Sequence, residues 1–285
     1  MKKLFLMMAS VLLLTGCGER TSLEVFDDVI NTLSEVKSIE MDTKAFVKVD
    51  AEGVALDVSL PFNLSLVENN EEATFSLDVK ENAIMDQTKV YGKTNAKNFK
   101  FYFPSTVLEL VLGETGGEEK WLSFSGDLTE LEETEFDSEM QSKLENLDYK
   151  KIILEENFVY VDKEEDIGHY QFVINEGLIQ RLATELGEEF EQTEDTSKIN
   201  LKLDMYINLK TNEITKIYMN LKDMIVDIIG DSVDESEEFD PNMFKEVSIE
   251  MNFKNYNNTS VVIPEDVINE AMAYEDYLKT IISEE

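Results

Sequence analysis

The sequence predicts an α+β fold in which a strongly curved, one-sided antiparallel sheet forms a half-barrel or open barrel, with helices packed across its concave face. From residue 38 onward, apolar and polar residues alternate over long runs, and a period of two is typical of strands that bury one face. The outward positions carry Lys, Glu, Asp and Asn, whereas strands in the middle layer of an α/β protein are apolar on both faces. Only a few segments have helical periodicity, so the helices are expected to pack on one face of the sheet.

The first half of the chain begins with a helix and continues as strands. Thr21 and Glu24 have the spacing of a capping box, and apolar residues recur at helical intervals from Leu23 to Val36. Alternation then predicts strands over 39–49 and 54–66 with a turn at 50–53, and further strands over 73–79, near 90 and over 99–103.

The second half mixes strands with short helices. Helices are predicted over 105–112, 137–147 and 178–190, and strands over 121–124, 150–161 and 168–174. The most regular alternation predicts strands over 199–209, 217–221 and 247–253, with a turn at 210–213. Pro264 opens a C-terminal helix that carries apolar residues as far as Ile281, because proline is favourable in a first helical turn.

Composition and charge restrict the class of protein. The chain has 285 residues, 42% of them hydrophobic, which is enough for a sizeable core. Its 61 Asp and Glu against 25 Lys and Arg give a net charge of −36, whereas binding to nucleic acid or anionic lipid needs a basic surface. The acidic runs are typical of solvated loops. The alternative is a divalent-cation site, but the run 231–242 lacks the glycine and ligand spacing of a calcium loop.

No linker rich in proline, glycine or serine divides the chain. One domain is therefore predicted over residues 22–285. The alternative is a pair of similar halves that meet at the acidic stretch 127–137.

The N-terminus resembles a lipoprotein signal. Lys2 and Lys3 precede an apolar run, 4–14, that is too short to span a bilayer as a helix and is typical of a secretory signal. The sequence Leu14-Thr15-Gly16-Cys17 then resembles the lipobox of bacterial lipoproteins. The alternative is an ordinary signal peptide that contains a cysteine.

The lipobox resemblance implies cleavage between Gly16 and Cys17 and a diacylglyceryl group on the Cys17 thiol, with acyl chains such as palmitate. Residues 1–16 would be the signal peptide and 17–21 a short tether. The domain would then lie close to the extracytoplasmic side of the cell membrane. Because Cys17 is the only cysteine, the mature chain would have neither a disulfide nor a free thiol.

Residues with catalytic chemistry are few. His169 is the only histidine, and the alternation places it beside Gln171 and opposite Tyr170, as an exposed or edge residue. One histidine supplies neither a serine triad within a cluster nor two zinc ligands, and no P-loop, GxGxxG, GxSxG or HExxH motif occurs. We expect no enzyme, no catalytic or metal-binding residue and no cofactor.

Two groups of apolar residues are candidates for lining a ligand site. Phe99, Phe101 and Phe103 share one face of a strand, which suits either a core or a pocket wall. Three methionines at inward positions either pack the core or form an adaptable lining for a flexible apolar ligand. They are Met205, Met219 and Met251.

The mature chain resembles the lipoprotein-carrier superfamily that includes LolA and LppX, and more closely uncharacterised Gram-positive lipoproteins. The resemblance rests on the helix after the lipobox, the strand, turn and strand of 205–222, and the closing run 253–271. It implies an unclosed antiparallel barrel whose mouth is plugged by helices, with a hydrophobic cavity for lipid or acyl chains and no catalytic residue. We expect a monomeric, membrane-anchored lipoprotein that binds or carries a lipid or other apolar ligand and no nucleic acid. The alternative is an envelope scaffold or interaction protein with a filled core.

Overall fold

The computed structural model describes residues 20–284, except 52–53, 70–71, 83–85, 96, 109–118, 128–142, 144–146, 188–198 and 233–239. The signal peptide, Gly16 and Cys17 lie outside the described residues. So do most of the helix predicted over 137–147 and nearly all of the acidic stretch 127–137.

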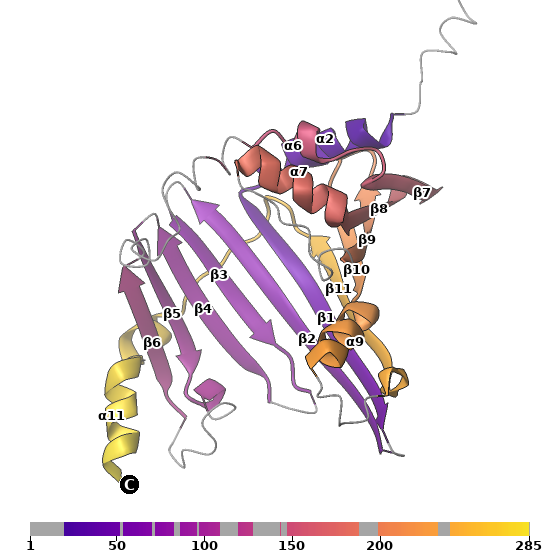
Figure 1. Cartoon of the computed structure of the whole chain (residues 1–285). Helices are drawn as coiled ribbons and strands as arrows, with labels where there is room; N and C mark the ends of the chain where they lie inside the picture. Colours follow the sequence, from indigo (N-terminus) through magenta and orange to yellow (C-terminus); the bar gives the residue numbers. More distant parts are fainter. Residues whose placement is uncertain are drawn as a thin grey trace, which may run out of the picture.

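One curved sheet of 12 strands runs through the molecule and does not close into a barrel (Figure 1). Its strand order is β12-β6-β5-β4-β3-β2-β1-β11-β10-β9-β8-β7. Strands β1–β6 form one antiparallel meander and β7–β11 a second, and the pairing of β1 with β11 joins them. The first meander comprises β1 (Ser38–Ala51), β2 (Val54–Asn69), β3 (Glu72–Val79), β4 (Thr88–Asn95), β5 (Asn98–Pro104) and β6 (Trp121–Asp127). The second comprises β7 (Phe158–Glu164), β8 (Ile167–Asn175), β9 (Asn200–Asn208), β10 (Ile214–Asn220) and β11 (Phe244–Lys254).

The register of the sheet explains why its two faces differ. Thr43 of β1 has Met251 and Phe62 as its Cα partners, so residues of like phase lie side by side across the sheet. The apolar phase of each strand therefore builds one continuous face, and the polar phase builds the other. This confirms the predicted one-sided antiparallel sheet.

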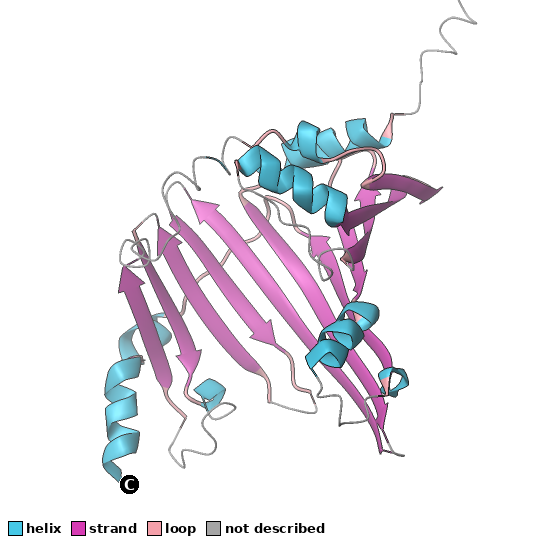
Figure 2. Ribbon diagram, in the orientation of Figure 1, coloured by secondary structure: helices cyan, strands magenta, loops and turns pink. Residues whose placement is uncertain are grey.

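Helices cover the apolar face of the second meander (Figure 2). They are α2 (Ser22–Ser34), which begins with the predicted capping box, α6 (Tyr149–Ile152) and α7 (Glu176–Leu186). Val25 and Val29 of α2 are each 1% exposed, and they pack in one core with Phe158, which is fully buried. The main core of the molecule thus lies beneath these helices. The other members of its buried set are Ile152, Ile153, Tyr170, Leu178, Met205, Ile207 and Ile214.

Three elements differ from the prediction. The strand expected from residue 150 begins only at Phe158, because residues 149–152 form α6 and bury Ile152 in the core. Helix α9 (Lys222–Ser232), which packs on β11, was not predicted. The single C-terminal helix is in fact two, α10 (Glu265–Glu270) and α11 (Tyr274–Glu284). They are separated by β12 (Met272–Ala273), which pairs in parallel with β6.

The segment that leads into α10 lies on the opposite face of the sheet from α2 and α7. Val267 of α10 is 3% exposed and packs against Tyr91 and Tyr102, which belong to the polar phase of β4 and β5. Figure 1 shows this segment passing behind the strands. The C-terminal helices therefore do not all lie across the concave face, because a second, smaller core holds α10 on the other side.

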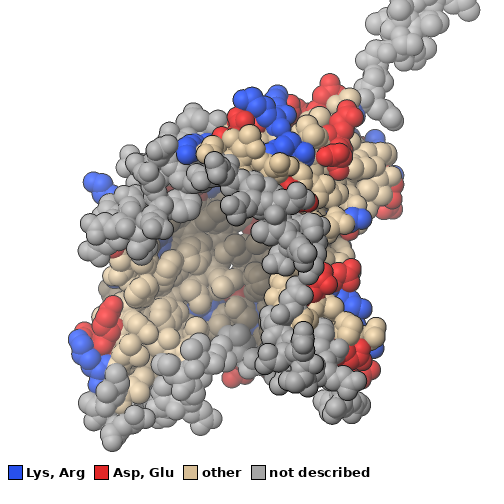
Figure 3. Space-filling view, in the orientation of Figure 1, with Lys and Arg blue, Asp and Glu red and all other residues tan. Residues whose placement is uncertain are grey.

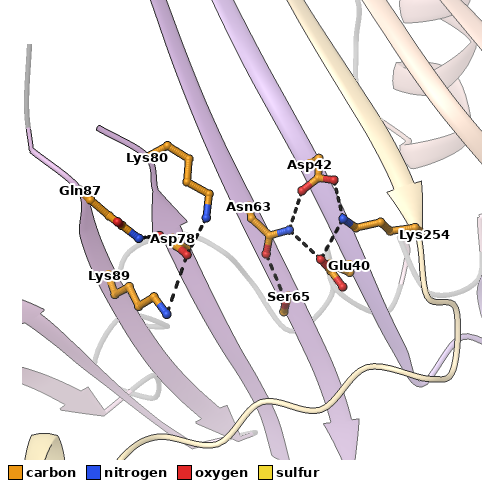
Figure 4. A network of polar contacts seen from close by, with 9 residues as sticks. All are labelled: Glu40, Asp42, Asn63, Ser65, Asp78, Lys80, Gln87, Lys89 and Lys254. Carbon is orange, nitrogen blue, oxygen red and sulfur yellow. Dashed lines mark hydrogen bonds and ion pairs between the residues drawn. The ribbon is translucent and has the colours of Figure 1, made fainter. Parts of the chain in front are cut away.

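A network of charged and amide side chains occupies the polar face of the central strands (Figure 4). Lys254 Nζ lies 3.1 Å from a Glu40 carboxylate oxygen and 2.5 Å from one of Asp42. Asn63 Nδ2 donates hydrogen bonds to both carboxylates, at 2.9 and 2.7 Å. The hydrogen bond from Lys254 lowers the pKa of Asp42, and the one from Asn255 lowers the pKa of Glu40.

Asp42 is expected to make stability depend on pH. Because its pKa is lower in the folded chain, its contribution is present above the unfolded pKa of about 3.9 and is lost as pH falls through the folded pKa. Asp42→Asn should flatten the fall in the free energy of unfolding between about pH 5 and pH 3, as measured by urea titration at a series of pH values. Lys254→Met should have a similar effect, since methionine cannot donate the hydrogen bond that Lys254 gives to Asp42. A slope equal to that of the wild type in both variants would contradict this assignment.

Candidate functional site

The apolar face of the first meander carries a cluster of phenylalanine rings. We call this cluster the aromatic face. Phe101 lies with its ring centroid 5.8 Å from that of Phe75 and 5.2 Å from that of Phe99. Phe99 in turn lies 5.5 Å from Phe124. Its members are Phe75, Phe99, Phe101, Phe103 and Phe124, from β3, β5 and β6.

Glycines make room for these rings. A Cβ atom at Gly92 would lie 2.2 Å from the ring of Phe75 and 2.7 Å from that of Phe101. At Gly126 it would lie 2.6 Å from the ring of Phe99. Such distances are far below van der Waals contact, so each ring occupies space over a neighbouring strand that is free only because glycine has no side chain there.

The aromatic face is only partly covered. Its rings are half-buried, except that of Phe124, which is 38% exposed. Leu66, on the same face of β2, is 40% exposed. Tyr274, the first residue of α11, contacts this face at the sheet edge, with its ring 5.9 Å from that of Phe124. Figure 3 shows a hollowed surface on this side of the sheet, in which residues other than Lys, Arg, Asp and Glu predominate.

The three methionines that are candidates for core packing or ligand lining occupy different surroundings. Met205 of β9 is 8% exposed and belongs to the main core beneath the helices. Met219 of β10 and Met251 of β11 are half-buried on the apolar face. Met251 lies opposite Thr43 on one side and Ile217 on the other. The structure thus places Met219 and Met251 near the middle of the sheet, between the covered core and the aromatic face.

Thr43 is a polar residue in the centre of the apolar face. Its side chain is 4% exposed, and in the described part of the chain its Oγ1 atom has no hydrogen-bond partner. A buried hydroxyl without a partner costs about 1–3 kcal/mol. Alternation alone assigned Thr43 to the inward phase, but only the structure shows that its hydroxyl is buried and unpaired.

Thr43→Val is expected to raise the free energy of unfolding by about 1 kcal/mol, because it replaces the unpaired hydroxyl with a methyl group of similar size. Urea unfolding measures the change. Thr74→Val, on the polar face of β3, is the matched control and should give no such gain. Destabilisation by Thr43→Val would instead indicate that the hydroxyl has a partner in solution.

A separate depression of about 320 Å³ lies at one end of strands β3–β6. Polar side chains predominate in its wall, and the cross-strand pair Lys93 and Lys100 is part of it. The wall consists of Glu72, Lys93, Thr94, Asn95, Asn98, Phe99, Lys100, Ser125 and Gly126. Because its side chains belong mostly to the polar phase of these strands, the depression does not extend the aromatic face.

His169 differs from its predicted exposed or edge position. Strand β8 lies between β7 and β9, and the His169 side chain is 17% exposed. Its ring stacks on Tyr206 at a centroid distance of 4.6 Å, and its Nε2 atom lies 3.1 Å from Asp204 Oδ1. Period-two alternation gave the correct face but could not show which neighbouring strand covers the ring.

In the part of the chain that the structure describes, no group of three or more His, Cys, Asp or Glu side chains has a geometry that could hold a metal ion. No helix there has both the length and the apolar character needed to cross a membrane.

Comparison with known proteins gives similarities to solved structures only. No protein-family model matches the chain, and no curated protein matches it. The Mycobacterium tuberculosis lipoprotein LppX aligns at 10% identity with a TM-score of 0.39, covering 85% of this chain and 98% of LppX. A putative outer membrane lipoprotein-sorting protein domain from Vibrio parahaemolyticus aligns at 8% identity with a TM-score of 0.25, covering 90% and 97%. A DUF1329 family protein from Desulfovibrio piger aligns at 11% identity with a TM-score of 0.24, covering 85% and 94%. With TM-scores this low, the function has to be inferred from the residues of this chain.

Proposed function

We propose that this protein is a membrane-anchored, extracytoplasmic lipoprotein without enzymatic activity, which binds a lipid or another apolar molecule on the aromatic face. The observation that carries this proposal is the contrast between the two ends of one apolar sheet surface. Helices cover a core on the second meander in which Phe158, Tyr170 and Ile207 are at most 4% exposed, whereas all five rings of the aromatic face are partly exposed. A contiguous exposed apolar patch on a soluble domain is typical of a binding site.

The binding mechanism would be burial of alkyl surface. Each methylene that leaves water for the aromatic face contributes about 0.8 kcal/mol. The rings offer flat apolar contact, while the half-buried Met219 and Met251 can adjust to the shape of a flexible chain. No step of this mechanism needs a catalytic group or a metal ion.

The anchoring part of the proposal rests on the sequence. The basic start, the apolar run and Leu14-Thr15-Gly16-Cys17 together favour a lipid on the Cys17 thiol. Two acyl chains hold a protein stably on a bilayer, where one chain would be marginal. The net charge of −36 means that surface electrostatics would not supply the attachment.

Extraction of co-purified lipid tests the proposed ligand. A Cys17→Ser variant, which would carry no covalent lipid, is purified without detergent, extracted with organic solvent and analysed by mass spectrometry. We expect a lipid that is bound non-covalently, and saturable binding of the fluorescent fatty acid cis-parinaric acid. If there is neither extractable lipid nor probe binding, the ligand hypothesis fails and a scaffold protein with a filled core is favoured.

A matched pair of substitutions locates the binding surface. Phe124→Asn introduces a polar group on the aromatic face, at a ring exposed enough for the fold to tolerate the change. It should weaken probe binding several-fold. Phe46→Asn makes the same change on β1, on the polar face of the sheet, and should leave probe binding unchanged. Equal losses in both variants would argue against the aromatic face as the site.

A further inference from the structure

The described chain begins at a residue that is fixed to the sheet. The guanidinium of Arg20 donates hydrogen bonds to Asp28 Oδ2 at 2.6 Å, to Asn212 Oδ1 at 2.7 Å and to the Leu209 carbonyl oxygen at 2.7 Å. Asp28 belongs to α2, whereas Leu209 and Asn212 belong to the turn between β9 and β10. Arg20 therefore ties the start of the domain to one end of the strands.

Helix α2 holds the same end in place. Thr21 Oγ1 accepts a hydrogen bond from the Glu24 amide, and a Glu24 carboxylate oxygen accepts one from the Thr21 amide. Val25 and Val29, in the following turns, are each 1% exposed in the main core. Moving the helix start away from the sheet would expose both side chains to water, so its position is set by packing as well as by Arg20.

Several tight turns meet at this end of the sheet, and we call their residues the turn surface. The Leu209 amide donates to the Asp166 carbonyl oxygen at 2.8 Å, and Lys210 Nζ lies 2.5 Å from an Asp166 carboxylate oxygen. The Tyr256 hydroxyl donates to the Ile214 carbonyl oxygen at 2.7 Å. These bonds join the β7–β8 turn, the β9–β10 turn and the segment after β11. The turn surface comprises Glu165, Asp166, Lys210, Thr211, Asn212, Asn255 and Asn257.

The turns of this surface are closely defined by their backbone. Glu165, Asn212, Asn255 and Asn257 have φ values between 52° and 57°, and they are the non-glycine residues with positive φ in the described chain. Asparagine adopts this left-handed conformation more readily than most residues. The strand ends are therefore held in a fixed arrangement beside Arg20.

The distance from the lipobox cysteine to this end is short. Three peptide steps separate Cys17 from Arg20, and a fully extended chain of that length reaches at most about 11 Å. We propose that the turn surface is the part of the domain that faces the phospholipid bilayer, so that the strands extend away from the membrane. This inference rests on the proposed lipid at Cys17.

The charges at this end favour contact with zwitterionic headgroups, with the lipid anchor alone holding the domain at the membrane. Arg20 is paired with Asp28, and Lys210 with Asp166, so neither cation is left free for an anionic lipid. The surface polar groups are mainly asparagine and threonine side chains. Approach to the bilayer should therefore depend little on ionic strength.

Asp57 lies at the opposite end of the strands from the turn surface. Ten residues of β2 separate it from Val67, which pairs with Ser38, and ten strand residues span about 33 Å.

Site-specific fluorescence quenching tests the orientation. The lipidated chain with Thr211→Cys or Asp57→Cys is labelled with a thiol-reactive fluorophore and reconstituted into phosphatidylcholine vesicles that contain a headgroup-nitroxide lipid. We expect several-fold stronger quenching at position 211, on the turn surface, than at position 57. A flexible Gly/Ser linker of 20 residues inserted between Glu19 and Arg20 allows a separation of about 25 Å and should remove most of the difference.

The outcomes separate this inference from the function on which it rests. Cys17 is the only cysteine, so a lipidated chain without added cysteine should not react with the fluorophore. Reaction of that chain, or failure to float with the vesicles, would contradict the proposed anchor. If the Cys17 thiol does not react and the chain floats with the vesicles, but the fluorophore is quenched equally at positions 211 and 57, only the proposed orientation is overturned. Undiminished quenching at position 211 after linker insertion would also overturn the proposed orientation, because the quenching would then not be caused by the short tether.

Discussion

Cys17→Ser is expected to abolish lipid attachment to the mature chain. Two acyl chains contribute on the order of 20 kcal/mol of burial in a bilayer, at about 0.8 kcal/mol per methylene, and serine has no thiol to carry them. Incorporation of labelled palmitate, and partition of the chain into the detergent-rich phase, should both fall to background.

Thr15→Ala is the matched control for this experiment. Thr15 occupies the variable position of Leu14-Thr15-Gly16-Cys17, so its replacement should leave palmitate incorporation intact. Palmitate incorporation that persists in Cys17→Ser would refute the lipobox assignment.

Phe158→Ala is expected to lower the free energy of unfolding by about 3–5 kcal/mol. The Phe158 side chain is fully buried. Its ring stacks on that of Tyr170 at 4.8 Å and meets that of Phe26 of α2 at 5.2 Å. Truncation would leave a cavity between β7, β8 and α2. Urea unfolding followed by circular dichroism measures the change.

Tyr160→Ala, on the same strand, is the control for Phe158→Ala. Tyr160 is 50% exposed although its ring also contacts Tyr170. Its truncation should cost about 1 kcal/mol or less. If the two variants unfold at similar urea concentrations, the core beneath α2 does not dominate the stability of the second meander.

Long strands could be predicted from the sequence because each buries one face only. In β1, and in β11 from Val247, apolar residues recur at every second position apart from Thr43, and both strands lie within a few residues of their expected ranges. Short elements could not be predicted in this way. Helix α6 has four residues and β12 has two, and both depend on partners distant in the sequence, namely the main core and β6. The periodicity of a short segment does not indicate which distant residues it packs against.

The candidate site could be predicted only in part. Period two placed Phe99, Phe101 and Phe103 on one face, and the register of β4 to β6 confirms that arrangement. Two further features of the aromatic face depend on cross-strand pairing, which a single sequence does not reveal. They are the rings added by Phe75 and Phe124 and the space left by Gly92 and Gly126. That these residues line a ligand site stays a prediction.

The pairing of β1 with β11 has a consequence for the order of folding. Met41 pairs with Phe253, so this contact closes a loop of more than two hundred residues, and such long-range contacts slow folding. The hairpins of each meander need only local contacts and can form earlier. Until β11 has been synthesised, β1 is an unpaired edge with an apolar face, which is a hazard for aggregation. The junction that makes one sheet of two meanders is therefore expected to form last.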